Sequence, residues 1–81
     1  MTVRVRVFAA LRELLGQDEC VMDVDAGTTV ETVWEALCAQ HPALAPFAAS
    51  VSFAVNREYV AADHRLSAPV EIAIIPPVSG G

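Results

Sequence analysis

The residues with the clearest chemical potential are two glycines at the end of the sequence, Gly80 and Gly81. Glycine lacks a Cβ atom, so a glycine pair can pass through a narrow slot with backbone angles that other residues avoid. We expect Gly81 to present its own terminal carboxylate, which is ionised at neutral pH. The carbon of a carboxylate is a poor electrophile, so acyl transfer from Gly81 would require prior activation by another molecule.

The residues before the glycines predict that the chain leaves the domain at a fixed point. An apolar run from Ile72 to Ile75 predicts a buried strand, and Pro76 and Pro77 follow it directly. Proline cannot donate a hydrogen bond to a neighbouring strand, and Pro77 biases Pro76 away from helix, so the strand must end there. The alternative is an ordinary frayed terminus in which glycines collect.

No other residues form a recognisable catalytic or metal-binding group. Cys20 and Cys38 lack CxxC spacing, and each falls on an apolar face, which favours buried structural thiols over redox or metal chemistry. His41 precedes a proline at a helix end and His64 lies in a polar loop, so both are expected to be surface histidines. The sequence has no glycine-rich phosphate loop and no HExxH motif. We therefore expect no bound metal or cofactor and no catalytic side chains.

Length and charge narrow the possible functions. The 81 residues are enough for one small domain, and ten acidic against five basic residues give a net charge of −5. An acidic balance argues against nucleic-acid binding, which requires a basic face. No apolar stretch reaches the roughly 20 residues needed to span a bilayer, and no signal-peptide pattern opens the chain. The expected location is the cytoplasm, with no membrane association.

The hydrophobic periodicity predicts five strands and two helices. Alternating apolar residues indicate strands, and Thr28 followed by Glu31 predicts a capping box at the start of the longer helix. The segment 42–50 is expected to be a loop with about one helical turn. The expected strands are 2–8, 19–24, 51–55, 59–60 and 70–75, and the expected helices are 9–15 and 30–38.

Strand parity divides the apolar residues between two faces. Leu11, Leu14 and Leu15 fall at helical spacing in the short helix. The other residues expected to share one core are Val5, Val7, Val33, Trp34, Leu37, Ile72 and Ile74. The same alternation turns Phe8 and Ile75 to the opposite face of the sheet, where an apolar patch beside the tail would suggest a partner site.

This order of elements predicts an α+β fold. Strands and one long helix share a single core, and the first and last strands, which have the strongest apolar patterns, are the natural central pair. A mixed sheet packed on one main helix in this order is the β-grasp, or ubiquitin-like, fold. We expect residues 1–76 to form this domain and residues 77–81 to form a flexible tail.

Three stretches resemble the small subunit of molybdopterin synthase, a ubiquitin-like sulfur carrier, and the resemblance covers the whole chain. They are Phe8–Gly16, Ala54–Glu58 and, most specifically, the ending Pro76–Gly81 with the sequence Pro-Pro-Val-Ser-Gly-Gly. The family commonly has an Asp-Gly-Asp-Glu-like turn before the last strand. Here that position reads Leu-Ser-Ala-Pro-Val-Glu over residues 66–71, so the turn geometry is expected to differ.

The resemblance implies a mechanism. In this family an ATP-dependent partner similar to ubiquitin E1 adenylates the terminal glycine, here Gly81, and sulfur then displaces AMP to leave a thiocarboxylate. The large synthase subunit binds the tail and uses its sulfur to build the dithiolene of molybdopterin on a cyclic pterin precursor. The resemblance thus implies a non-catalytic sulfur-carrying subunit, a heterotetrameric synthase and ATP consumed by the activating partner.

Several residues are predicted to contact partners. Gly80 and Gly81 form the reactive end, and the predicted partner-binding residues are Phe8, Tyr59, Ile75, Pro76, Pro77, Val78 and Ser79. Two alternatives share the same activated glycine. One is a sulfur carrier for thiamine, cysteine or tRNA thiolation, and the other is a ubiquitin-like modifier conjugated to lysines of other proteins.

Overall fold

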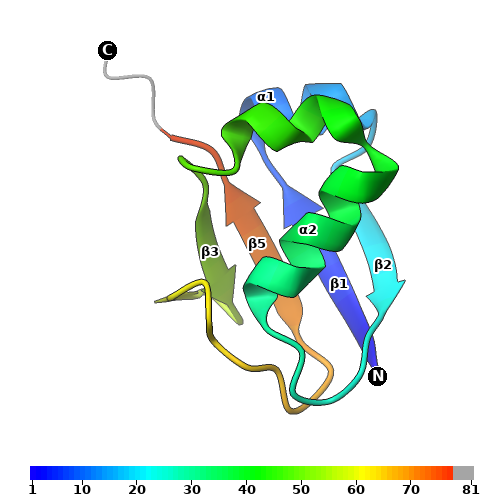
Figure 1. Cartoon of the computed structure of the whole chain (residues 1–81), viewed down its shortest axis with the longest axis vertical. Helices are drawn as coiled ribbons and strands as arrows, with labels where there is room; N and C mark the ends of the chain where they lie inside the picture. Colours follow the sequence, from blue (N-terminus) through cyan, green and yellow to red (C-terminus); the bar gives the residue numbers. More distant parts are fainter. Residues whose placement is uncertain (78–81) are drawn as a thin grey trace.

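A computed structural model describes residues 1–77 of the chain (Figure 1). This part contains five strands, two α-helices and one 3₁₀-helix. The strands are β1 (Thr2–Val7), β2 (Glu19–Asp23), β3 (Ser52–Val55), β4 (Glu58–Val60) and β5 (Glu71–Ile75), and the helices are α1 (Ala9–Leu15), α2 (Val30–Gln40) and the 3₁₀-helix η1 (Pro42–Phe47).

The strands form one mixed sheet in the order β2-β1-β5-β3-β4. β1 and β5 run parallel, and every other neighbouring pair is antiparallel. The prediction that the first and last strands lie side by side near the centre of the sheet is confirmed. α2 crosses one face of the sheet (Figure 1), so the predicted α+β architecture with the β-grasp order is confirmed.

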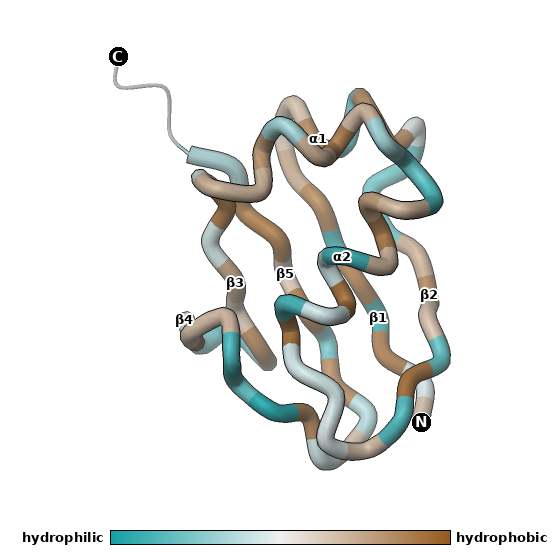
Figure 2. The backbone as a smooth tube through the Cα atoms, viewed as in Figure 1, coloured by the Kyte–Doolittle hydropathy of each residue, from teal (hydrophilic) through white to brown (hydrophobic). Residues whose placement is uncertain are grey.

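The core lies between α2 and the inner face of the sheet, which is the face that α2 covers. All seven residues expected to share this core are at most 3% exposed and belong to one buried cluster. Figure 2 shows apolar and polar residues alternating along β1, as expected for a strand with one buried face. One expectation was wrong: Leu14 is 44% exposed, whereas Leu11 and Leu15 on the same helix are buried.

The start of α2 differs by one residue from the predicted capping box. Thr29, rather than Thr28, is the N-cap, and its side chain accepts a hydrogen bond from the Thr32 amide at 3.2 Å. The backbone of Thr28 is engaged elsewhere, because its carbonyl accepts from the Leu66 amide at 2.9 Å. A long-range contact with residue 66 thus moves the helix start, which local sequence could not reveal.

A two-residue turn joins β3 to β4. Asn56 and Arg57 both have positive φ values, 48° and 72°, as in the type I′ turns that favour Asn-Gly. Asn56 also contacts the start of β5, since its Oδ1 accepts from the Glu71 amide at 3.2 Å and its own amide donates to the Glu71 carbonyl at 2.9 Å. The turn therefore helps to fix the register of β3 against β5.

Replacing Arg57 with glycine is expected to raise the free energy of unfolding by about 0.5–1 kcal/mol. The left-handed conformation costs a residue with a Cβ atom about 1–2 kcal/mol, and part of this gain is offset by the greater unfolded-state entropy of glycine. Urea unfolding followed by circular dichroism measures the difference. Arg57→Ala is the matched control, because it removes the charge and keeps the Cβ atom; a glycine variant no more stable than the alanine variant would contradict this account.

Candidate functional site

The candidate site begins where β5 leaves the sheet. β5 pairs with β1 on one side and β3 on the other, and Ile72 and Ile74 are fully buried. Pro76 and Pro77 follow directly, and neither can extend the hydrogen-bonded ladder. A strand held on both edges therefore fixes where the chain exits and in which direction (Figure 1). Val78, Ser79, Gly80 and Gly81, four of the predicted site residues, lie outside the described residues.

An apolar hollow of about 460 Å³ lies at this exit, and we call it the exit groove. It combines the end of β1, the start of α1, the end of η1 and the prolines after β5. Its lining residues are Phe8, Ala9, Ala10, Phe47, Ile75, Pro76 and Pro77. The structure thus brings together four of the predicted partner-binding residues, whose role in binding stays a prediction.

Tyr59 shares a sheet face with Ile75 but does not line the exit groove. Strand pairing sets Tyr59 opposite Ala54, and Ala54 opposite Ala73. Ile75 lies two residues beyond Ala73 on the same strand, so its side chain points to the same outer face, the one that α2 does not cover. Tyr59 is 74% exposed. The small side chains of the two alanines separate it from the groove along a continuous face.

The backbone around Phe8 is held by the first turn of α1. The Phe8 carbonyl accepts hydrogen bonds from the amides of Leu11 and Arg12, at 3.1 and 3.4 Å. Ala9 has a φ of 50°, a left-handed conformation that is unfavourable for an L-residue with a Cβ atom. Such local strain often accompanies a functional site. Here it makes the sharp transition from β1 to α1 that leaves the Phe8 ring beside the exit.

Charged side chains border Phe8 on the outer face. The Arg6 guanidinium lies 5.6 Å from the centroid of the Phe8 ring, within the range of a cation–π contact. One nitrogen of the same guanidinium is 3.9 Å from a carboxylate oxygen of Glu71 on β5. On the neighbouring strand pair Arg4 contacts Glu19 at 2.9 Å. Arg6 is thus the charged side chain in contact with a lining residue of the groove, and its partner Glu71 lies at the opposite end of β5 from the exit.

Three lining residues, Ala9, Ala10 and Phe47, were not predicted to belong to the site. Phe47 is 28 positions from Ile75 in the sequence and reaches the groove because η1 ends beside the β5 exit. Two prolines, Pro42 and Pro46, were the available sign that this segment would be ordered. They did not indicate which side of the domain it would reach.

Among residues 1–77, no other group competes as a chemical centre. Both cysteines are free thiols. Burial raises the pKa of the Cys20 thiol, with a further contribution from Glu19, and burial followed by the Glu35 charge raises the pKa of Cys38. Both are therefore protonated and weakly nucleophilic at neutral pH. The described part of the chain has no cluster of three metal-ligating side chains. It also has no helix with the length and apolar character needed to cross a bilayer.

Comparison with known protein families identifies the family of this chain. The model of the ThiS family matches residues 5–81, which includes every element except the first residues of β1. The chain belongs to the ThiS family. This match extends through Gly80 and Gly81, so the ThiS-family assignment covers the end of the chain as well as the domain that presents it.

Two relatives with the same name match this ThiS-family protein over almost their full length. The molybdopterin synthase sulfur carrier subunit of Chlamydomonas reinhardtii is 37% identical, and the alignment covers 100% of both chains. The protein of the same name from Escherichia coli (strain K12) is 38% identical, and the alignment covers 98% of this chain and 99% of that protein.

Solved structures place the ThiS-family chain among ubiquitin-like proteins. SAMP1 from Haloferax volcanii superposes with a TM-score of 0.87 at 31% identity, covering 100% of both chains. A complex of subunits 1 and 2 of the molybdopterin-converting factor from Helicobacter pylori contains a chain that superposes with a TM-score of 0.70 over 100% of both chains. At 20% identity this second match supports the fold alone.

Proposed function

We propose that this ThiS-family protein is the sulfur carrier subunit of molybdopterin synthase. Gly81 carries sulfur as a thiocarboxylate and donates it to the cyclic pterin precursor during molybdopterin formation. The observation that carries the proposal is the fixed exit of β5 into Pro76 and Pro77, which the sequence continues with Val78, Ser79 and two glycines. Relatives of equal length with the name molybdopterin synthase sulfur carrier subunit support the same assignment.

The proposed chemistry needs two partners. An activating enzyme similar to ubiquitin E1 joins an oxygen of the Gly81 carboxylate to the α-phosphate of ATP, and pyrophosphate leaves. Hydrosulfide then attacks the acyl carbon, and AMP departs with that oxygen to leave the thiocarboxylate and a proton. The carrier supplies no catalytic side chain and binds no cofactor of its own. It works in the cytoplasm, where ATP is available to the activating enzyme.

The exit groove is the proposed contact with the large synthase subunit. An apolar, concave surface beside a reactive end allows one partner to bind the domain and receive the tail together. Phe8, Ile75 and the two prolines supply apolar area, and Arg6 supplies a positive charge beside the Phe8 ring. We propose that two carriers and two large subunits form a heterotetramer, and that the activating enzyme uses the same surface at another stage.

A second candidate function is conjugation to other proteins, which the 31% identity to a small archaeal modifier protein favours. The composition limits this alternative, because all five basic residues of this chain are arginines and none is lysine. The chain can therefore donate its terminus but cannot accept another copy through a lysine side chain. Chains of this protein linked through lysine side chains therefore cannot form.

Replacing Phe8 or Ile75 with alanine should weaken binding to the large synthase subunit. Truncating an apolar anchor at the centre of an interface commonly costs about 2 kcal/mol, or about thirtyfold in Kd. Calorimetry measures Kd for each variant, and the melting temperature shows that the fold is intact. Val21→Ala is the matched control, since Val21 is 61% exposed and lies at the β2 edge of the sheet, away from the exit groove. Unchanged affinity in both groove variants would remove this surface from the mechanism.

A further inference from the structure

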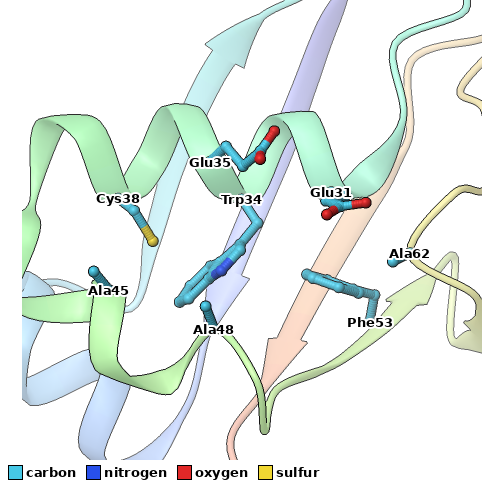
Figure 3. A pocket seen from close by; sticks show the side chains of 8 residues that line it. All are labelled: Glu31, Trp34, Glu35, Cys38, Ala45, Ala48, Phe53 and Ala62. Atoms are coloured by element: carbon cyan, nitrogen blue, oxygen red, sulfur yellow. The ribbon is translucent and has the colours of Figure 1, made fainter.

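A second hollow lies on the inner side of the sheet, and we call it the helix groove. It has a volume of about 280 Å³ between α2, η1, β3 and the segment after β4. Its lining residues are Glu31, Trp34, Glu35, Cys38, Ala45, Ala48, Phe53 and Ala62 (Figure 3). Phe53 pairs with Ile74 rather than with Ile75, so the helix groove and the exposed outer face lie on opposite sides of the sheet.

The helix groove has an apolar floor and an acidic rim. Figure 3 shows the indole of Trp34 between Ala45 on one side and Phe53 on the other. Glu31 and Glu35 come from successive turns of α2, so their side chains are neighbours on one helix face. Both are exposed, and neither forms an ion pair within residues 1–77. Two free carboxylates above an apolar surface are complementary to a long cationic side chain, and less so to an apolar side chain.

The indole nitrogen of Trp34 supplies independent evidence for a ligand. Trp34 is 3% exposed, and its Nε1 is the one buried side-chain donor or acceptor in the described part of the chain that has no hydrogen-bond partner. A buried donor without an acceptor is unfavourable, and native proteins rarely leave one unmatched. Trp34 lines the helix groove, so a ligand bound there can supply the missing acceptor.

We propose that the helix groove binds a segment of a partner protein that presents an arginine beside an apolar residue. The planar guanidinium can bridge the carboxylates of Glu31 and Glu35 through paired hydrogen bonds, which a lysine ammonium cannot match in geometry. The stem of that arginine and the neighbouring apolar side chain cover Trp34 and Phe53. A shift of the indole on binding exposes the buried Trp34 Nε1, and a backbone carbonyl of the segment then accepts its hydrogen bond.

This surface is independent of the proposed sulfur transfer. The Cys38 thiol beside Glu35 stays neutral, because burial raises its pKa, so the two glutamates supply the negative charge of the groove. The helix groove and the exit groove share no lining residue, although η1 borders both. The net charge of −5 favours the approach of a basic partner.

The single tryptophan makes the proposal directly testable, because the protein gives one indole N–H resonance. The probe is the capped tripeptide acetyl-leucyl-arginyl-leucine amide, titrated into isotopically labelled full-length protein. We expect a saturable downfield shift of the Trp34 indole proton as Nε1 gains an acceptor. The citrulline analogue, which is neutral and nearly isosteric, should bind at least about tenfold more weakly, because it cannot form charge-assisted hydrogen bonds.

Variants assign the effect to the groove. The double variant Glu31→Gln with Glu35→Gln should bind the arginine peptide at least about tenfold more weakly. Glu13→Gln, on the exposed side of α1, and Phe8→Ala, in the exit groove, should leave its affinity unchanged. The proposal is overturned if the indole proton does not move saturably, or if arginine and citrulline peptides bind equally. A shift that appears on concentrating the protein without peptide would instead assign the groove to a second copy of this chain.

Discussion

Replacing Trp34 with alanine is expected to lower the free energy of unfolding by about 3–5 kcal/mol, the usual cost of removing a large aromatic side chain from a core. Trp34 is 3% exposed and belongs to the cluster that joins α2 to the sheet. A domain of this size has a free energy of unfolding of about 5–10 kcal/mol, so the variant should lose a large share of its stability. Urea unfolding followed by far-ultraviolet circular dichroism measures the loss.

Two variants separate the causes of this loss. Trp34→Phe keeps an aromatic ring and removes the unpartnered Nε1 donor, so it should be clearly less destabilising than the alanine variant. Tyr59→Ala removes an aromatic side chain that is 74% exposed, and it should change the free energy of unfolding by less than about 1 kcal/mol. If the Trp34→Ala variant has the same free energy of unfolding as the wild type, the core packing is wrongly described.

The sequence was informative about the core because side-chain alternation depends on local geometry. Val3, Val5 and Val7 could be assigned to the inner face from period-two spacing alone, and Val33, Trp34 and Leu37 from helical spacing. Leu14 was misassigned because helical spacing does not say which part of a short helix lies over the core. Thr28 was misassigned because its backbone bonds to Leu66, a contact that only the folded chain creates.

The candidate site, like the core, was only partly predictable from the sequence. The position of Ile75 and Phe8 on the exposed face followed from strand parity, and the reactive end followed from the types of the last residues. Phe47 could not be placed, because the path of η1 depends on packing against distant elements. The helix groove was equally inaccessible, since Trp34 was predicted to be an ordinary core residue and its unpartnered nitrogen is visible only in three dimensions.

Deleting Gly81, or adding one residue after it, is expected to abolish sulfur loading and leave stability unchanged. Activation requires a free carboxylate at a fixed distance from the β5 exit, and either change moves that carboxylate relative to the activating enzyme. The buried residues of the core all lie before Pro76, so melting temperatures should match wild type. Val21→Ala is the matched control, because it alters an exposed side chain on β2 and preserves the length and the terminal glycines.

Intact-mass spectrometry of the loaded protein tests the central claim most directly. The full-length protein is incubated with the activating enzyme, ATP and a sulfur donor, and the product is then fragmented to locate the change. The account predicts a mass increase of about 16 Da, the difference between sulfur and oxygen, confined to Gly81. No increase in mass, or sulfur attached to Cys20 or Cys38, would contradict it.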